Sequence, residues 1–175
     1  MDRLIYMDNA ATTSVKPEVL NSMLPFFTDN YANPSSIYNF AQKSKKAVED
    51  ARTTIADIIG ADKPNEIYFT ASGSESDNWA LKAAAEFFKD KGNHIITTKI
   101  EHHAILHTCE WLEKHGYEVT YLDVDSNGLV DIDEFCAAIK DTTIIASIMY
   151  ANNEIGTIEP IKELGAAAHS KGVIF

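Results

Sequence analysis

The sequence has little cysteine and no long apolar run. Its two cysteines, Cys109 and Cys136, lie far apart without a Cys-x-x-Cys pair, which argues against a disulfide framework and against a zinc site. We expect both to be small buried residues. No apolar run approaches the roughly 18 residues that a membrane span needs, and residues 1–11 lack the charged and then apolar regions of a signal peptide. These absences predict a cytoplasmic protein without a bound metal.

Positive charge is also scarce. The 175 residues contain 15 Lys and Arg against 26 Asp and Glu, so the formal net charge is −11. The acidic residues are spread over helix-like stretches, which indicates solubility and argues against nucleic acid or an anionic membrane as a partner. A hydrophobic fraction of 45% is enough to bury a core. We therefore expect a folded domain whose partners are small molecules or other proteins.

Short β-rich runs alternate with helical patterns over most of the chain. The candidate strands are 66–70, 94–98, 117–122, 143–149 and 172–175. The candidate helices between them are 74–89, 103–115, 131–139 and 160–171. Within the second of these helices, Ile105, Cys109 and Leu112 share one face. The alternation predicts an α/β fold with a mostly parallel sheet and flanking helices.

The first 60 residues follow a different pattern. An irregular stretch through Thr13 precedes candidate helices at 17–27 and 39–59. Such an arm cannot bury its apolar face alone, so we expect residues 1–60 to pack on an α/β domain formed by residues 61–175, or on a second subunit. A candidate strand that ends at Phe175 also predicts that this domain is truncated at its C-terminus.

A run of small residues at 69–76 passes from a candidate strand into a candidate helix. Free N–H groups at a helix N-terminus and the positive end of its dipole favour a phosphate, and Gly73 allows a ligand to approach the backbone. Ser72 and Ser74 add hydroxyl donors. The alternative interpretation is that Ser72 or Ser74 only caps the helix, with Glu75 supporting the first turn. The run is neither a GxGxxG nor a P-loop, so it does not indicate a dinucleotide or ATP.

A second pattern lies at 123–134, where the residues fit the calcium-loop motif D-x-[DN]-x-[DN]-G-x5-E. A calcium loop of this kind needs a helix on both sides, whereas the preceding residues 117–122 are β-rich. We therefore favour a strand, a turn at 126–128 and a helix capped by Asp131, with Glu134 at capping-box spacing. The competing hypothesis is a calcium-binding module.

Five motifs occur in one order along the chain: YMDNAATT at 6–13, NPSS at 33–36, GSESDN at 73–78, EHHA at 101–104 and NNEIG at 152–156. In this order and at these intervals they resemble cysteine desulfurases of the class V aminotransferase group, which depend on pyridoxal 5'-phosphate and have fold type I. The resemblance implies that the chain is the amino-terminal part of such an enzyme, with a truncated large domain of that fold.

The resemblance also implies roles for single residues. Gly73 and Ser74 match positions that hold the cofactor phosphate. His102 matches the histidine that stacks on the pyridine ring and takes part in proton transfer, and an imidazole titrates near neutral pH. Asn153 matches the residue that donates a hydrogen bond to the phenolic oxygen of the cofactor. Asn33 is a weaker candidate for shaping the substrate entrance.

By the same resemblance, the complete enzyme is expected to convert L-cysteine to L-alanine and an enzyme persulfide. It is expected to act as a homodimer and to deliver sulfur to an iron–sulfur scaffold or another acceptor protein. The lysine that holds the cofactor and the cysteine that takes the sulfur match no position in these 175 residues, so we expect them beyond residue 175 and expect the chain alone to be inactive. Other class V enzymes, such as selenocysteine lyases or transaminases of small amino acids, share the phosphate and histidine motifs and are the alternatives.

Overall fold

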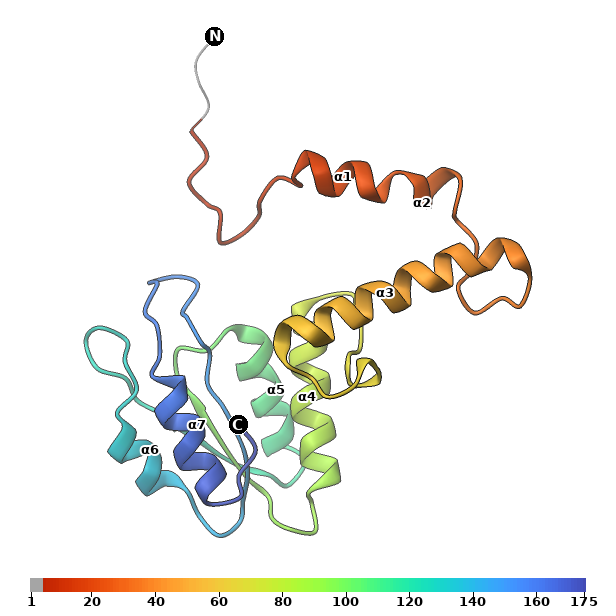
Figure 1. Cartoon of the computed structure of the whole chain (residues 1–175). Helices are drawn as coiled ribbons and strands as arrows, with labels where there is room; N and C mark the ends of the chain where they lie inside the picture. The colour runs from red at the N-terminus through yellow and green to blue at the C-terminus, as the bar shows by residue number, and fades with distance from the viewer. Residues whose placement is uncertain (1–4) are drawn as a thin grey trace. The chain divides into compact units, whose positions relative to one another are not determined.

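A computed structural model describes residues 5–175 (Figure 1). The backbone contacts divide the chain into two units, a first unit that ends at Phe69 and a second unit, Thr70–Phe175. Among the described residues, no helix is long and apolar enough to cross a membrane.

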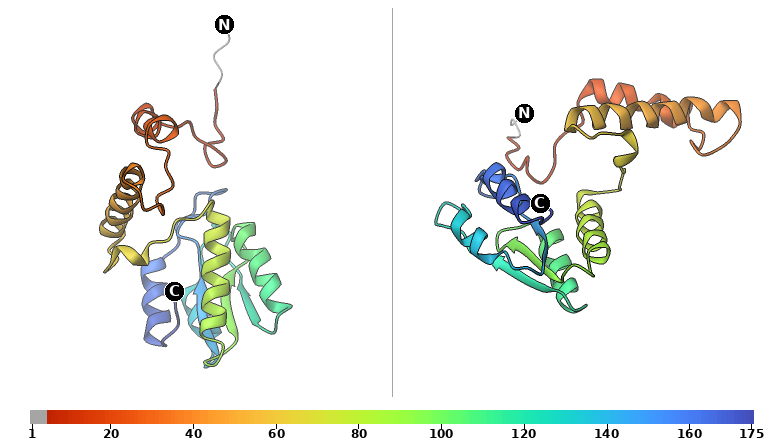
Figure 2. Two further views of the ribbon diagram at one scale, coloured as in Figure 1. Left: turned by 90° about the vertical axis from the view of Figure 1, so that its right-hand side faces the viewer. Right: turned by 60° about the horizontal axis from the view of Figure 1, so that its bottom comes forward.

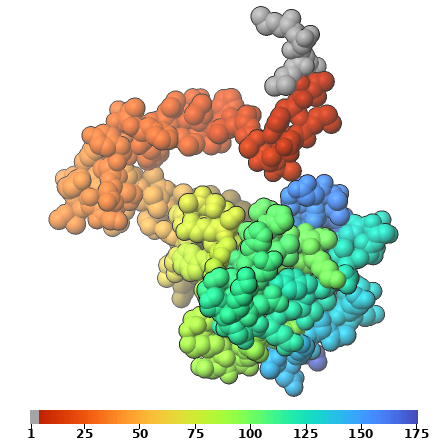
Figure 3. Space-filling model, turned by 180° about the vertical axis from the view of Figure 1, so that it is seen from behind, coloured from red at the N-terminus to blue at the C-terminus, as the bar shows by residue number. Residues whose placement is uncertain are grey.

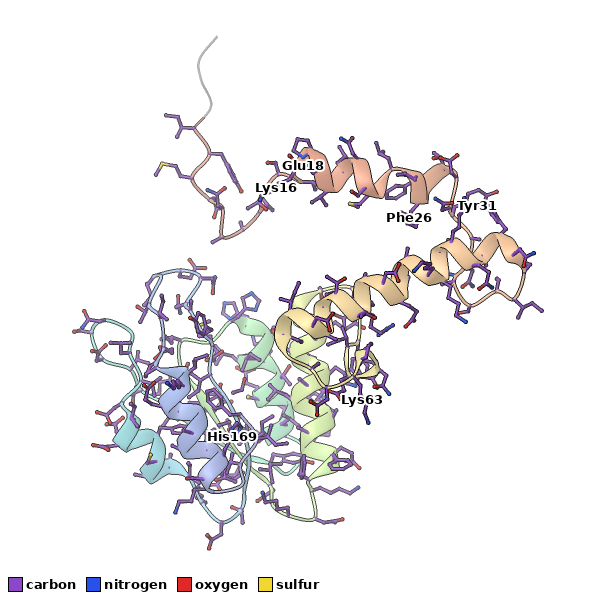
Figure 4. All side chains as sticks on the ribbon, viewed as in Figure 1. Lys16, Glu18, Phe26, Tyr31, Lys63 and His169 are labelled. Carbon is purple, nitrogen blue, oxygen red and sulfur yellow. The ribbon has the colours of Figure 1, made fainter. Side chains whose placement is uncertain are left out.

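The first unit is helical. Its elements are α1 (Pro17–Met23), α2 (Pro25–Thr28), the 3-10 turn η1 (Asn39–Ala41), α3 (Gln42–Ile59) and the 3-10 turn η2 (Pro64–Glu66). The helix expected at 17–27 is divided after Leu24, because Pro25 has no N–H to continue the hydrogen-bond ladder. No residue of α1 or α2 is buried, and the exposed side chains include Phe26, which is labelled in Figure 4.

The strand expected at 66–70 is not formed. Residues 67–70 are extended but belong to no β-ladder. The carbonyl of Ile67 accepts a hydrogen bond from the guanidinium of Arg52 on α3, and that guanidinium also lies over the ring of Phe69, 5.0 Å from its centroid. The β-rich composition therefore produces an extended segment held by a side chain of α3, since a strand needs a neighbouring strand to complete it.

The second unit contains the α/β fold. Its elements are α4 (Gly73–Phe87), β1 (His94–Thr98), α5 (His103–Glu113), β2 (Glu118–Leu122), α6 (Ile132–Ala138), β3 (Thr143–Ser147) and α7 (Ile161–Ser170). The strands form a sheet in the order β2-β1-β3, and both pairings are parallel. The strand expected at 172–175 is reduced to one parallel bridge between Ile145 and Ile174. The predicted fold class, with a parallel sheet and flanking helices, is confirmed.

The sheet carries a hydrophobic core on each face. One core joins α4 and α5 to the sheet and includes Leu81, Ile95 and Leu112. The other joins α6 and α7 to the opposite face and includes Phe135 and Leu164. Figure 2 shows the sheet between α7 on one side and the pair α4 and α5 on the other. The second unit is therefore a three-layer α/β/α sandwich whose sheet is covered on both faces, as parallel sheets are.

The central strand of the sheet begins with a buried histidine. His94, at the start of β1, is fully buried, and its ring nitrogens contact the hydroxyls of Thr143 on β3 at 2.7 Å and Thr120 on β2 at 2.8 Å. Burial, more than the nearby Lys140 ammonium, lowers the pKa of the His94 imidazole below its ordinary value. The three strands are thus joined by one neutral side chain at their amino ends.

The two cysteines have different environments. Cys109 is fully buried in the core beneath α5, as expected. The expectation that Cys136 is buried was wrong, because its side chain is exposed. The neighbouring Phe135 is the residue of α6 that points into the core. Residues one step apart on a helix face different directions, so an apolar run does not bury all its members.

Candidate functional site

The candidate site residues of the second unit lie at the carboxyl edge of the sheet. β1 ends at Thr98 and leads to His102, and β3 ends at Ser147 and leads to the loop that contains Asn153. The helix α4 precedes β1 through a short connection and runs back along the sheet, beside α5 in Figures 1 and 2, so its first residue, Gly73, lies at the same edge. Ligands of open parallel α/β sheets bind at this edge.

The turn that begins α4 is held by its own side chains. Ser72 is the N-cap residue, and its hydroxyl accepts a hydrogen bond from the N–H of Glu75 at 3.2 Å. The carboxylate of Glu75 accepts the N–H of Ala71 at 2.6 Å, and the hydroxyl of Thr70 donates to the carbonyl of Ser72 at 2.9 Å. The cap that the sequence indicated is therefore present and uses Ser72, while Ser74 takes no part in it.

The N–H groups of Gly73 and Ser74 have no acceptor among residues 5–175 in the hydrogen bonds of this turn. A Cβ atom placed on Gly73 would meet no atom within 4 Å, so neither packing nor a left-handed backbone requires glycine there. The structure thus offers two free donors, the positive end of a 15-residue helix and open space above the backbone. This donor set and this space fit a phosphate group.

His102 stands at the start of α5. It is the N-cap residue, and its Nδ1 accepts the N–H of Ala104 at 3.1 Å. An acceptor Nδ1 carries no proton, so the neutral imidazole has its proton on Nε2. The ring is exposed. The helix cap therefore fixes the tautomer of His102 and leaves Nε2–H facing outward as a donor.

Asn152 and Asn153 have different positions although they are neighbours. Asn152 is 7% exposed, and its Oδ1 accepts the N–H groups of Glu154 at 2.8 Å and Ile155 at 3.0 Å. Asn153 is exposed, and its Nδ2 donates to the Glu154 carboxylate at 3.1 Å. Asn152 therefore shapes the loop, and the amide of Asn153 lies on the loop surface.

Two contacts join the loop of Asn153 to the segment before His102. The Nδ2 of Asn152 donates to the carbonyl of Ile100 at 3.0 Å, and the N–H of Met149 donates to the Glu101 carboxylate at 2.8 Å. The hydroxyl of Thr98 also donates to this carboxylate, at 3.0 Å. Neither Glu101 nor Asn152 was predicted from the sequence to be a site residue. Their positions beside His102 and Asn153 within the EHHA and NNEIG motifs were the available signal.

Glu101 is a buried carboxylate, 8% exposed. Burial raises the pKa of its carboxyl group, and the hydrogen bonds from Met149 and Thr98 oppose that rise. A hollow of about 310 Å³ lies on the face of the sheet that α4 and α5 cover, and its lining includes Asp77 of α4, Ser147 at the end of β3 and Ile148. This hollow follows α4 from Asp77 to Ala84, and none of Gly73, Ser74, His102 and Asn153 lines it.

The remaining candidate, Asn33, belongs to the first unit. Its Oδ1 accepts the N–H of Ser35 at 2.9 Å, which closes a turn in the NPSS segment, and its side chain is exposed. Its role at the substrate entrance stays a prediction. The other candidates, Gly73, Ser74, His102 and Asn153, share the carboxyl edge of one sheet.

The segment that fits the calcium-loop pattern follows a strand and contains a turn and the start of a helix, as expected. β2 leads into the segment, and a turn follows at 126–128. The Asp125 carboxylate accepts the N–H groups of Asn127 and Leu129, and the Asp131 carboxylate caps α6 through the N–H groups of Asp133 and Glu134. No group of three or more metal-binding side chains occurs among residues 5–175. The acidic residues therefore serve the backbone of a strand-turn-helix connection.

The nucleophile of a sulfur transfer is not provided by Cys109. Burial raises the pKa of its thiol to about 12, so it is protonated at neutral pH and closed to solvent. Two lysines of this unit have other partners: Lys82 lies over the Trp111 ring, and Lys99 pairs with Asp123. Cys109 is therefore unsuited to act as the nucleophile, and the side chains of Lys82 and Lys99 are engaged elsewhere.

The parallel sheet with helices on both faces places the second unit in the class of three-layer α/β proteins. The sequence matches the family model "Aminotransferase class-V" over residues 5–175. The chain belongs to the class V aminotransferase family.

The similar proteins are desulfurases and NifS-like proteins. The chain is 59% identical to the cysteine desulfurase IscS of Clostridium botulinum (strain Kyoto / Type A2), over all of this chain and 44% of that protein. A solved structure of a NifS-like protein matches 96% of this chain and 46% of its own, with a TM-score of 0.92 and 40% identity. SspA in complex with cysteine matches 96% of this chain and 48% of its own, with a TM-score of 0.90 and 41% identity. The chain spans less than half the length of each, and it corresponds to their amino-terminal part.

Proposed function

We propose that this chain forms the cofactor-facing part of a cysteine desulfurase that uses pyridoxal 5'-phosphate and converts L-cysteine to L-alanine and an enzyme persulfide. The observation that carries the proposal is the meeting of three elements at one sheet edge: the free N-terminus of α4, His102 and the loop of Asn153. The similarity to desulfurases supports this reaction over that of a selenocysteine lyase or a transaminase.

The cofactor, when bound, supplies an electron sink for bonds at the α-carbon of the amino acid. Each residue of the chain then has a separate task. Gly73 and Ser74 bind the phosphate through backbone N–H groups, and Ser74 adds its hydroxyl. His102 presents Nε2 as the atom that donates and accepts a proton. The side-chain amide of Asn153, which donates to Glu154 in this structure, would donate to the phenolic oxygen of the bound cofactor.

Glu101 and Asn152 act as positioning residues in this proposal. They hold the segment before His102 against the loop of Asn153 at two separate points, Met149 and Ile100. Rigid support of this kind matters because a small displacement of a group from its productive geometry lowers a reaction rate strongly. Glu101 and Asn152 therefore keep the imidazole of His102 and the side-chain amide of Asn153 at a constant separation.

The phosphate assignment is tested with the variant Gly73→Asp. An acidic residue in the first turn suits the helix dipole, so the fold is retained, while the added carboxylate occupies the open space and repels phosphate. Fluorescence titration with pyridoxal 5'-phosphate and with unphosphorylated pyridoxal should show that Gly73→Asp loses the preference for the phosphorylated compound. The control Ala166→Asp adds the same charge to an exposed position of α7 and should retain the preference. Equal preference in both variants would refute the assignment.

The expectation that the chain alone does not turn over is tested by adding pyridoxal 5'-phosphate and L-cysteine and measuring alanine. We expect no alanine and no absorption band of a lysine-linked cofactor, since the lysine and the nucleophilic cysteine match no position here. Formation of alanine would contradict this account. In the complete protein we propose a homodimer that passes sulfur to an iron–sulfur scaffold or another acceptor protein. We place it in the cytoplasm, where a reducing environment suits its two unpaired cysteines.

A further inference from the structure

The outer face of α5 carries an unusual row of aromatic side chains. His103, His107 and Trp111 follow one another at intervals of four residues and share one face of the helix, and His115 follows at the same interval, two residues after the helix ends. All four are exposed, and Figure 3 shows α5 (green) on the outside of the second unit. The row is separate from the core contacts of α5, which use Ile105, Cys109 and Leu112 on the other side.

The two halves of this row differ in their contacts. His115 is stacked on Trp111 with ring centroids 3.6 Å apart, and its Nδ1 lies 2.7 Å from the carbonyl of Trp111. The rings of His103 and His107 are also stacked, with centroids 5.3 Å apart and planes 23° from parallel. No side-chain hydrogen bond or ion pair to a residue of the range 5–175 engages either ring. His103 and His107 therefore keep their nitrogen lone pairs available.

We propose that His103 and His107 bind one divalent late transition-metal ion, Cu²⁺, Ni²⁺ or Zn²⁺, as a two-histidine chelate on the surface of α5. Imidazole is a preferred ligand of these ions, and two histidines four residues apart on a helix face the same ion in known zinc motifs. A metal bonded to both rings at about 2.0–2.1 Å holds their centroids roughly 5 Å apart. The observed 5.3 Å is close to that separation, and rotation about χ2 turns the nitrogens toward a shared ion.

Water completes the coordination of this ion. Because residues 5–175 provide no set of three metal-binding side chains, the chelate has two protein ligands and open positions. The His102 ring lies 6.3 Å from that of His103, so a bound ion lies beside the imidazole of the candidate site. The chelate depends only on the two exposed histidines, and it stands or fails independently of the proposed desulfurase function.

Calorimetric titration of the 175-residue chain with CuCl₂ and with NiCl₂ tests the chelate. Every protein in the test carries Cys136→Ser, because an exposed thiol is itself a ligand for these ions. We expect one ion per chain, with Cu²⁺ bound more tightly than Ni²⁺. His103→Ala and His107→Ala should each weaken binding by at least about tenfold, since a second ligand on the same scaffold raises affinity by roughly 10²-fold or more. Electron paramagnetic resonance of the Cu²⁺ complex should show coupling to two nitrogens, and to one in either variant.

The matched control is His169→Ala, which removes a single exposed histidine from α7 (labelled in Figure 4) and should leave binding unchanged. Circular dichroism should show that all variants remain folded, because both ligands are exposed. Two results would overturn the chelate: no binding of either ion, or a loss in His169→Ala as large as the loss in His103→Ala or His107→Ala.

Discussion

The two adjacent asparagines of the NNEIG motif allow a direct test of how the site is built. We predict that Asn152→Ala destabilises the second unit strongly and that Asn153→Ala does not. Asn152 is buried and makes three backbone hydrogen bonds, to Ile100, Glu154 and Ile155. Asn153 is exposed and makes one hydrogen bond, to an exposed carboxylate.

The magnitude follows from these contacts. A hydrogen bond contributes about 1 kcal/mol net, so the loss of three lowers the free energy of unfolding by about 3 kcal/mol in Asn152→Ala. The carbonyl of Ile100 also loses its partner, which acts in the same direction. For Asn153→Ala the expected change is within about 0.5 kcal/mol, as for other exposed substitutions.

Urea unfolding followed by tryptophan fluorescence measures both variants. The chain has two tryptophans, Trp79 and Trp111, and both lie in the second unit, so the signal reports that unit. Amide hydrogen exchange supplies a local measurement, because the N–H groups of Glu154 and Ile155 should exchange faster in Asn152→Ala alone. Equal destabilisation by the two variants, or unchanged exchange at these amides in Asn152→Ala, would refute the assignment of Asn152 as the residue that holds the loop.

Three further predictions concern the second unit. First, the stability of the second unit should fall as the pH drops below about 6.5, which is the pKa of an unfolded histidine. The reason is that the imidazole of His94 has a lowered pKa in the folded state and therefore binds fewer protons there. His94→Gln should flatten this dependence of stability on pH. Second, Glu101→Gln should raise the stability of the second unit at pH 7, whereas Glu101→Ala should lower it. Because the pKa of the Glu101 carboxyl group is raised in the folded state, its contribution to stability is fully present below the unfolded pKa and is lost as the pH rises. Third, Asp131→Ala should cost about 1 kcal/mol through loss of the α6 cap, and Ser126→Ala should cost almost nothing.

The same urea measurement, repeated at several pH values, checks all three. An unchanged slope between pH 5 and 7 in His94→Gln would disprove the role of the buried imidazole. A loss of stability in Glu101→Gln as large as that in Glu101→Ala would mean that the charge of Glu101 is required. Equal effects of Asp131→Ala and Ser126→Ala would remove the cap from the account.

Local patterns predicted most of the second unit. The helices and the three strands of the sheet lie within one or two residues of the predicted ranges, because apolar spacing depends on the element's own residues. The caps at Ser72 and Asp131 were also recognisable, since a capping side chain and the N–H groups that donate to it lie within three residues of each other. These features need no information from distant parts of the chain.

The features that sequence patterns missed depend on distant partners. The segments 66–70 and 172–175 have strand-like composition, but a strand also requires a neighbour along its edge. Glu101 meets Met149, and Asn152 meets Ile100, only because two loops emerge side by side from the sheet. A polar residue that will be buried by such a meeting has no periodic signature, so only their places within the EHHA and NNEIG motifs distinguished Glu101 and Asn152 from solvent-exposed loop residues.

His94, which contacts hydroxyl groups of β2 and β3 at the amino edge of the sheet, also affects the carboxyl edge. Shifting β2 by one residue would place Val119 or Tyr121 where Thr120 now stands, and the imidazole would lose its hydroxyl neighbour inside a closed interior. A shifted pairing of β1 with β2 therefore costs free energy at the amino ends of these strands. The pairing of β1 with β2 then continues without a shift as far as Thr98 and Leu122, so the relative heights at which the loops after these two strands emerge are favoured at their amino ends, by a side chain outside the candidate site. The pairing of β1 with β3 shifts by one residue directly after His94, so this effect is limited to β1 and β2.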